Sequence, residues 1–251
     1  NYTCEYSVTD EDELEKNAIL SFNVVVGESL DKYLTEAMNI LQYVLIDSPG
    51  APLKKKLVDS GICSDVESQY DSSLRQPLFS ILAREAESED EERFVDIINS
   101  ELKKYVDEGL DKKALTAAIN NFEFRTKEAN FGRFPKGLAF GLDSFECWLH
   151  DDASAQEKFR TNEVYENLRK GIEDGLFERL IEKWILQNDH KAYIKAVPVV
   201  GLNTEKDAAL AKKLAEYKKS LSDSEIDKLI AETAHLKEYQ SEPSTAEELE
   251  S

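Results

Sequence analysis

The chain contains three histidines, His150, His190 and His235, and their spacing decides which metal chemistry the sequence can support. A helical zinc site for hydrolysis uses two histidines four residues apart together with an acid. No two of these histidines have that spacing. His150 precedes Asp151 and Asp152, which leaves a ligand role open, but a cation at a helix C-terminus is the better interpretation. The sequence therefore predicts no metal ligands in this chain.

Motifs for other kinds of catalysis are also missing from the sequence. There is no G-x-S-x-G elbow, no phosphate-binding P-loop and no G-x-G-x-x-G fingerprint. Ser72 and Ser73 have no histidine nearby in sequence, which favours a turn over a nucleophile. The basic, glycine-rich stretch 131–137 could bind an anion, but it lacks phosphate-loop spacing, so a corner between two helices is favoured. The carboxylates between 85 and 92 lie at the start of a predicted helix, where the helix dipole favours them.

The chain is strongly acidic, and this restricts the partners that it can have. Its 251 residues carry a net charge of −20, from 51 acidic and 31 basic residues. Such a surface repels the phosphates of nucleic acid and the anionic face of a membrane, and it attracts basic peptides. Solubility alone also explains the charge. No apolar run approaches the roughly 20 residues that cross a bilayer, so we expect neither nucleic-acid nor membrane partners.

The three cysteines, Cys4, Cys63 and Cys147, are widely spaced and form no C-x-x-C motif. This pattern predicts neither a zinc ribbon nor a disulfide framework. Cys63 and Cys147 lie among apolar residues, so we expect both to be buried. Free thiols fit a reducing compartment. The sequence therefore predicts a cytoplasmic location, or an organellar matrix in a eukaryote.

The spacing of apolar residues predicts both strands and helices in the first 200 residues. In chain order we expect a strand at 2–6, a strand at 17–28, a helix at 30–47, a short helix at 52–58, strands at 62–71 and 76–84, helices at 88–108, 112–130 and 135–149, a helical region at 161–187 interrupted near Gly171 to Gly175, and a strand at 190–198. Ser88, with Glu91 three residues later, predicts a capping box, and Asp111 predicts the N-cap of the helix that follows it. Strict β-α-β-α alternation is absent. The order predicts an α+β fold, in which helices cover one face of a mainly antiparallel sheet.

A change in composition at Gly201 predicts a domain boundary. Residues 1–200 are expected to form one α/β domain. Residues 201–240 contain two charged helical segments separated by Ser222, which predicts an αα-hairpin linker that rests on another surface. We interpret residues 241–251 as a truncated connector, and the start at Asn1 without an initiator Met as a further sign of an internal piece of a larger protein.

Several sequence strings occur together and in order along the chain. They are TDEDELEKNA at 9–18, DSPGAPL at 47–53, YDSSLRQP at 70–77, EGLDK at 108–112, FRTKEANFGRFPKGL at 124–138 and CWL at 147–149. Together they resemble the presequence protease branch (subfamily C) of the M16 pitrilysin/insulysin-like zinc metallopeptidases. The resemblance covers nearly the whole chain.

The resemblance implies a position within a larger enzyme. Residues 1–200 would be the second, non-catalytic domain of the N-terminal half, with the M16/LuxS-like metallohydrolase fold, and 201–240 the hairpin that joins the halves. The HxxEH zinc site would belong to a preceding domain, so zinc is expected in the parent enzyme and no cofactor in this chain. The family's catalytic Arg and Tyr belong to the second half, and the pseudo-equivalent segment 57–64 has Val58 and Ser64 near those positions.

Three functions are compatible with these observations. The first is a chamber wall and scaffold of a zinc metalloendopeptidase that degrades unstructured peptides, including basic ones, with the remaining domains of the parent peptidase as partners. The second is an inactive M16-like interaction module whose parent has no peptidase activity. An independent small-molecule-binding protein is the weakest of the three, because no convergent polar cluster is visible. The segment itself is expected to be inactive in each case.

Candidate substrate contacts lie on the two strands around residues 70–79. They are Tyr70, Ser72, Arg75 and Phe79, which lie near the segment that corresponds to the family's second-half catalytic stretch. A structural role is the alternative for each of these four residues, and the sequence favours that role over substrate binding. Arg133 and Lys136 could contact another domain. No catalytic residue and no metal ligand is predicted.

Overall fold

The computed structural model describes residues 1–11, 14–159 and 161–244, which form two compact units. The first unit covers Asn1–Val200 and the second covers Gly201–Ser251. Part of the predicted connector, 245–251, lies outside the described residues. Within the described residues, every helix is too short or too polar to cross a lipid bilayer.

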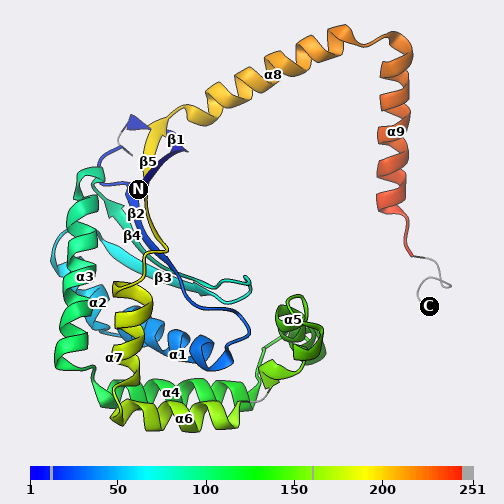
Figure 1. Ribbon diagram of the computed structural model, residues 1–251. Coiled ribbons are helices and arrows are strands. Elements are labelled where there is room, and N and C mark those ends of the chain that lie inside the picture. The colour runs from blue at the N-terminus through cyan, green and yellow to red at the C-terminus, as the bar shows by residue number, and fades with distance from the viewer. Residues whose placement is uncertain (12–13, 160, 245–251) are drawn as a thin grey trace. The chain divides into compact units, whose positions relative to one another are not determined.

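A five-stranded sheet forms the centre of the first unit (Figure 1). Its strands are β1 (Tyr2–Val8), β2 (Ala18–Val25), β3 (Asp65–Asp71), β4 (Leu78–Ala86) and β5 (Lys191–Val200), in the spatial order β1-β5-β2-β4-β3. Within the described residues, only the β1–β5 pair is parallel. The prediction of an α+β fold with a mainly antiparallel sheet is therefore confirmed.

Helices surround one side of this sheet (Figure 1). They are α1 (Lys32–Gln42), α2 (Pro52–Asp59), α3 (Glu91–Glu108), α4 (Lys112–Glu128), α5 (Lys136–Trp148), α6 (Asn162–Glu173) and α7 (Leu176–Ile181). The break between α6 and α7 falls where it was predicted, at Gly175, whose φ of 66° is left-handed and suits glycine.

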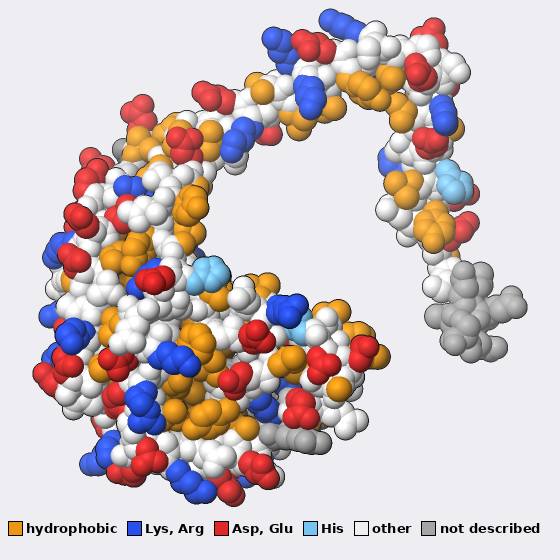
Figure 2. Space-filling view, viewed as in Figure 1, with side chains coloured by type: hydrophobic (Ala, Val, Ile, Leu, Met, Phe, Trp, Pro, Cys, Tyr) orange, Lys and Arg blue, Asp and Glu red, His pale blue; other side chains and the backbone are white. Residues whose placement is uncertain are grey.

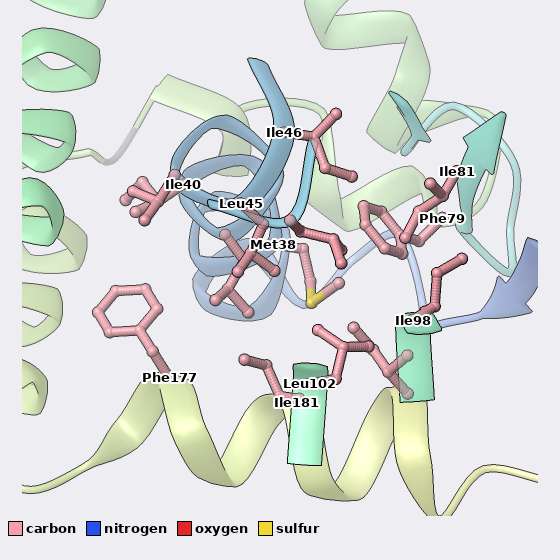
Figure 3. Close-up of a cluster of buried hydrophobic side chains, with 14 of the residues drawn as sticks. Met38, Ile40, Leu45, Ile46, Phe79, Ile81, Ile98, Leu102, Phe177 and Ile181 are labelled. Atoms are coloured by element: carbon pink, nitrogen blue, oxygen red, sulfur yellow. The ribbon is translucent and has the colours of Figure 1, made fainter. Parts of the chain in front are cut away.

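The core lies between the sheet and these helices, and Figure 3 shows part of it. Alternate residues of the central strands point into it, because side chains along a strand alternate between two faces. The labelled side chains come from the segment 38–46, from β4, α3 and α7: Met38, Ile40, Leu45, Ile46, Phe79, Ile81, Ile98, Leu102, Phe177 and Ile181. Each large side chain buried in this way contributes about 1.5–3 kcal/mol.

Some predicted boundaries differ from the structure. The helix predicted at 30–47 is α1 followed by a π-helical turn, Tyr43–Asp47. The capping box predicted for Ser88 and Glu91 is wrong, because a 3₁₀ turn precedes α3 and its N-cap is Asp90, without a side-chain capping bond. Asp111 is the predicted N-cap of α4, and it accepts hydrogen bonds from the N–H groups of two residues in the first turn.

The opposite face of the sheet carries apolar residues, although the helices lie on the other side (Figure 1). Ile19, Leu82 and Ile194 are partly exposed on this open face. A polar pair in the middle of it is internally bonded: Ser80 Oγ donates to Asn23 Oδ1 at 2.7 Å. A sheet face that meets water is ordinarily polar. This face is therefore mixed, because Glu67, Gln69 and Arg84 lie on it beside the aliphatic residues.

The second unit consists of α8 (Leu202–Ser220) and α9 (Asp223–Ser241). Ser222 caps α9 with a complete capping box, in which Glu225 Oε2 accepts from the Ser222 N–H at 2.8 Å. Neither helix contains a buried residue. An open apolar groove of about 580 Å³ is lined by both helices, including Leu221, Ile226 and Ile230.

Candidate functional site

The four predicted contact residues do not form one surface in the structure. Tyr70 and Phe79 are directly opposite each other on β3 and β4. Phe79 is fully buried in the core, so it presents no surface to a peptide. Tyr70 packs against the same core, and burial raises the pKa of its hydroxyl to about 12. Both side chains therefore point toward the helices and stabilise the fold.

The other two candidates lie in the turn between β3 and β4. The Arg75 side chain is exposed, and its backbone carbonyl accepts a hydrogen bond from the Ser29 N–H at 3.0 Å. The neighbouring Ser73 carbonyl is 3.2 Å from His150 Nε2, at the C-terminal end of α5. The predicted position of His150 at a helix end is confirmed, since α5 ends at Trp148. Ser72 is half-buried and lines a small cavity between the turn, α1 and α5.

This cavity brings together polar side chains from distant parts of the first unit. Its volume is about 20 Å³, and its lining includes Lys32, Thr35, Glu36, Ser72, Cys147 and Lys158. The buried hydroxyls of Ser29 and Thr35 have no hydrogen-bond partner among the described residues. This volume suits one water molecule. It is too small for a peptide side chain.

Two lysines join the α5 region to α1 across this cavity. Lys32 Nζ donates to the Glu157 carbonyl at 2.8 Å and also to the Lys158 carbonyl. Lys158 forms an ion pair with Glu146 of α5. Burial lowers the pKa of both lysines, although nearby carboxylates act in the opposite direction. The cluster therefore anchors α5 through charged side chains that are partly removed from water.

Glu36 is the most unusual carboxylate in the cluster. It accepts a hydrogen bond from the Tyr165 hydroxyl at 3.1 Å, and that hydroxyl is 3.0 Å from Thr126 Oγ1. Burial raises the pKa of Glu36, and this effect outweighs the opposing charges of Lys32 and Lys158. The contacts connect α1, α4 and α6, which is a structural role.

The chemistry of the cluster is not that of a hydrolase centre. Burial raises the pKa of the Cys147 thiol, which keeps it protonated and poorly nucleophilic. The described residues contain no group of three or more His, Cys, Asp or Glu side chains that could hold a metal ion. The residues present in this part of the chain therefore do not fit a zinc site.

Comparison with known families explains this arrangement. The family described as "Peptidase M16 inactive domain" matches residues 1–122, and a second family, described as associated with the peptidases of M16 subfamily C, matches residues 197–251. The chain belongs to the M16 peptidase family. Protein HypA of Clostridium perfringens is 34% identical over 98% of this chain, and presequence protease 1, chloroplastic/mitochondrial, of Arabidopsis thaliana is 30% identical over 98%. The chain spans 25% and 23% of the lengths of these two relatives.

Solved structures of two proteases share the fold. A protease from Helicobacter pylori has a TM-score of 0.55 at 13% identity, covering 77% of this chain and 44% of that one. The periplasmic protease PqqL of Escherichia coli has a TM-score of 0.52 at 12% identity, covering 79% of this chain and 21% of that one. At these identities the likeness concerns the fold alone.

The M16 fold places two features that sequence reasoning missed. The polar cluster around Lys32, Glu36 and Lys158 joins residues more than 120 positions apart, and no short sequence motif predicts it. The second feature is the direction of α5. Its apolar spacing was visible in the sequence, but its large apolar side chains lie at the surface (Figure 2).

In segment 57–64, Val58 packs against the core and Ser64 Oγ donates to Glu85 at 2.6 Å, which are both structural contacts.

Proposed function

We propose that this chain is a non-catalytic wall and scaffold of a zinc metalloendopeptidase that degrades unstructured peptides. The observation that carries the proposal is the open face of the sheet, which has partly exposed aliphatic residues, Ile19, Leu82 and Ile194, and no helical layer of its own. The support from similarity is the match to an inactive M16 domain, together with relatives that are named presequence proteases. The remaining domains of the parent polypeptide would complete the chamber.

The open face suits an extended peptide better than a folded ligand. Its partly exposed Ile19, Leu82 and Ile194 lie beside polar residues, and the Asn23 side chain is already hydrogen-bonded to Ser80, Ser21 and the Ala192 carbonyl. Such a surface contacts apolar side chains without demanding a particular sequence. The net charge of −20 favours basic peptides over acidic ones. Both properties fit a broad preference for unstructured, basic substrates.

Zinc would be held by another domain of the parent, since the described residues of this chain offer no suitable donor set. When bound there, zinc would activate water for peptide hydrolysis. The role of this chain would be to position peptide and to support the zinc domain. We further propose a reducing location, the cytoplasm or an organellar matrix, on the support of three free cysteines.

The proposal is tested with the full-length polypeptide that contains this segment. We expect that polypeptide to cleave unstructured peptides in a chelator-sensitive reaction, and the isolated chain to show no cleavage with added zinc. Leu82→Glu on the open face should raise KM while zinc content stays constant. Lys55→Glu, an exposed change on α2, serves as the control. A full-length protein without peptidase activity would instead support an inactive interaction module.

A further inference from the structure

Helix α5 presents an apolar face to solvent. Leu138, Leu142, Phe145, Trp148 and Leu149 are 51%, 51%, 50%, 48% and 75% exposed. The spacings of four, three and four residues place Leu138, Leu142, Phe145 and Leu149 on one side of the helix. We call these five residues the α5 face. Side chains of this size rarely gather on a monomer surface unless they bind something.

The inward side of α5 is small and polar, which is the reverse of an ordinary surface helix. Ala139 and Cys147 are its buried residues. Ser144 Oγ donates to the Ala155 carbonyl at 2.7 Å, and Glu146 forms the ion pair with Lys158. These contacts fix which side of α5 meets the body of the domain. The apolar side is therefore held outward by specific polar interactions.

The aromatic rings around the face are already packed in fixed geometry. The rings of Phe145 and Trp148 stack with centroids 5.5 Å apart and planes at 24°. Next to them, Phe140 makes edge contacts with Phe131 at 5.6 Å and with Phe159 at 5.7 Å. Rings ordered before binding lose little entropy when a partner covers them. Buried aromatic anchors of this kind carry much of the energy of protein interfaces.

Charged residues at the two ends of the α5 face indicate which charges its partner would carry. Arg133 and Lys136, just before and at the start of α5, are exposed and form no ion pair within the described part of the chain. This is notable in a chain with 51 acids and 31 bases. Asp151 and Asp152 lie beyond the other end of α5. A complementary partner would be acidic opposite Arg133 and Lys136 and basic opposite the two aspartates.

We propose that the α5 face docks into an apolar groove on another domain of the same polypeptide, outside residues 1–251. The relatives from Clostridium perfringens and Arabidopsis thaliana contain about three quarters of their length outside the segment that matches this chain. A groove on the same polypeptide meets the face at a high effective concentration, so a modest apolar area is sufficient. This inference rests on the proposed function in one respect, because both require that the chain is part of a longer polypeptide.

The decisive experiment is a photo-crosslink in the full-length polypeptide, with p-benzoylphenylalanine in place of Phe145. We expect the crosslinked peptide, identified by mass spectrometry, to come from outside residues 1–251 of the same molecule. A crosslink to a second copy, to an added peptide substrate, to lipid or only within residues 1–251 would overturn the proposal. The same probe at Phe124, an exposed ring on α4, is the control for non-specific capture.

Paired variants give an independent readout. Trp148→Asp should leave the melting temperature of the isolated chain within about 1 °C, because an exposed side chain contributes little to its stability. In the full-length polypeptide the same change should lower the melting temperature by several degrees, and Arg133→Glu with Lys136→Glu should lower it less. Lys55→Glu is the matched charge control. Equal shifts in both contexts would contradict docking, whereas loss of peptidase activity alone would bear only on the proposed function.

Discussion

Helices α1 and α5 have similar apolar spacing but opposite environments. In α1 the residues Leu34, Met38 and Leu41 are buried against the sheet, whereas Leu138, Leu142 and Phe145 of α5 are half exposed. Each helix is attached by its inward side, and the attachment is apolar for α1 and polar for α5. The comparison shows that an amphipathic pattern identifies a binding side without identifying the partner.

The difference follows from what each helix covers. α1 comes after β2, and its apolar side packs onto the sheet that β2 helps to form. The core residues from the other helices come from α2, α3, α4, α6 and α7, and α5 contributes none. No apolar surface of the core remains for α5, which therefore attaches through Lys158 and its neighbours.

The largest expected difference between the two environments comes from removing one phenyl ring from each. Phe79→Ala should destabilise the chain by about 3–5 kcal/mol, because it leaves a cavity in the core. Phe145→Ala should change stability by no more than about 0.5 kcal/mol, because that ring is half exposed. Urea unfolding of the isolated chain measures both. A large loss at Phe145 would mean that α5 contributes to the core after all.

Adding a methyl group at a helical glycine, one near the core and one in α5, should also separate the two environments. A Cβ on Gly171 of α6 would lie 2.6 Å from Leu176 Cδ2 and 2.9 Å from Leu176 Cβ. Gly171→Ala should therefore cost about 1–3 kcal/mol through overpacking. A Cβ on Gly141 of α5 meets nothing within 4 Å. Gly141→Ala should instead stabilise the chain by about 0.5–1 kcal/mol, as alanine does in an open helix. Opposite signs in thermal unfolding are the expected result.

The fold was largely predictable because its main signals are local. The apolar run of β2, Asp111 at the start of α4 and the glycines near 171–175 each mark an element from neighbouring residues. Errors arose where hydrogen-bond register decides the outcome. The 3₁₀ turn before α3 displaces the N-cap from Ser88 to Asp90, and the sequence around it allows either position.

The candidate site was much less predictable, because it depends on which face of an element is inward. Tyr70 and Phe79 are good strand residues, but only the pairing of β3 with β4 shows that both point to the core. The polar cluster requires Glu36 and Tyr165 to meet across 129 positions. Neither arrangement has a signal within a short window of sequence.

The pH dependence of stability should distinguish the polar cluster from the apolar core. The pKa of Glu36 is raised above its ordinary value of 4.5 by burial. Between that value and the higher pKa of the folded state, the unfolded chain releases a proton that the folded chain keeps, so Glu36 reduces stability as pH rises. Glu36→Gln retains an acceptor for Tyr165 and removes this penalty. Its unfolding free energy relative to the parent chain should therefore increase with pH, and Phe79→Ala should show no such trend.

A small effect on overall stability is expected at the ion pair that holds α5. Lys158→Met keeps the aliphatic stem and removes the charge that faces Glu146. Because both side chains are partly exposed, we expect a loss of no more than about 1 kcal/mol in urea unfolding. Hydrogen exchange should nevertheless quicken across residues 136–148 while α1 and the central strands stay protected, since local opening needs only the local contacts to break. Lys103→Met on α3, which removes a more exposed ion pair, is the control and should leave α5 exchange unchanged. If Lys158→Met also quickened exchange in α1, α5 and the core would open as one unit. The distinction between a polar attachment of α5 and an apolar attachment of α1 would then fail.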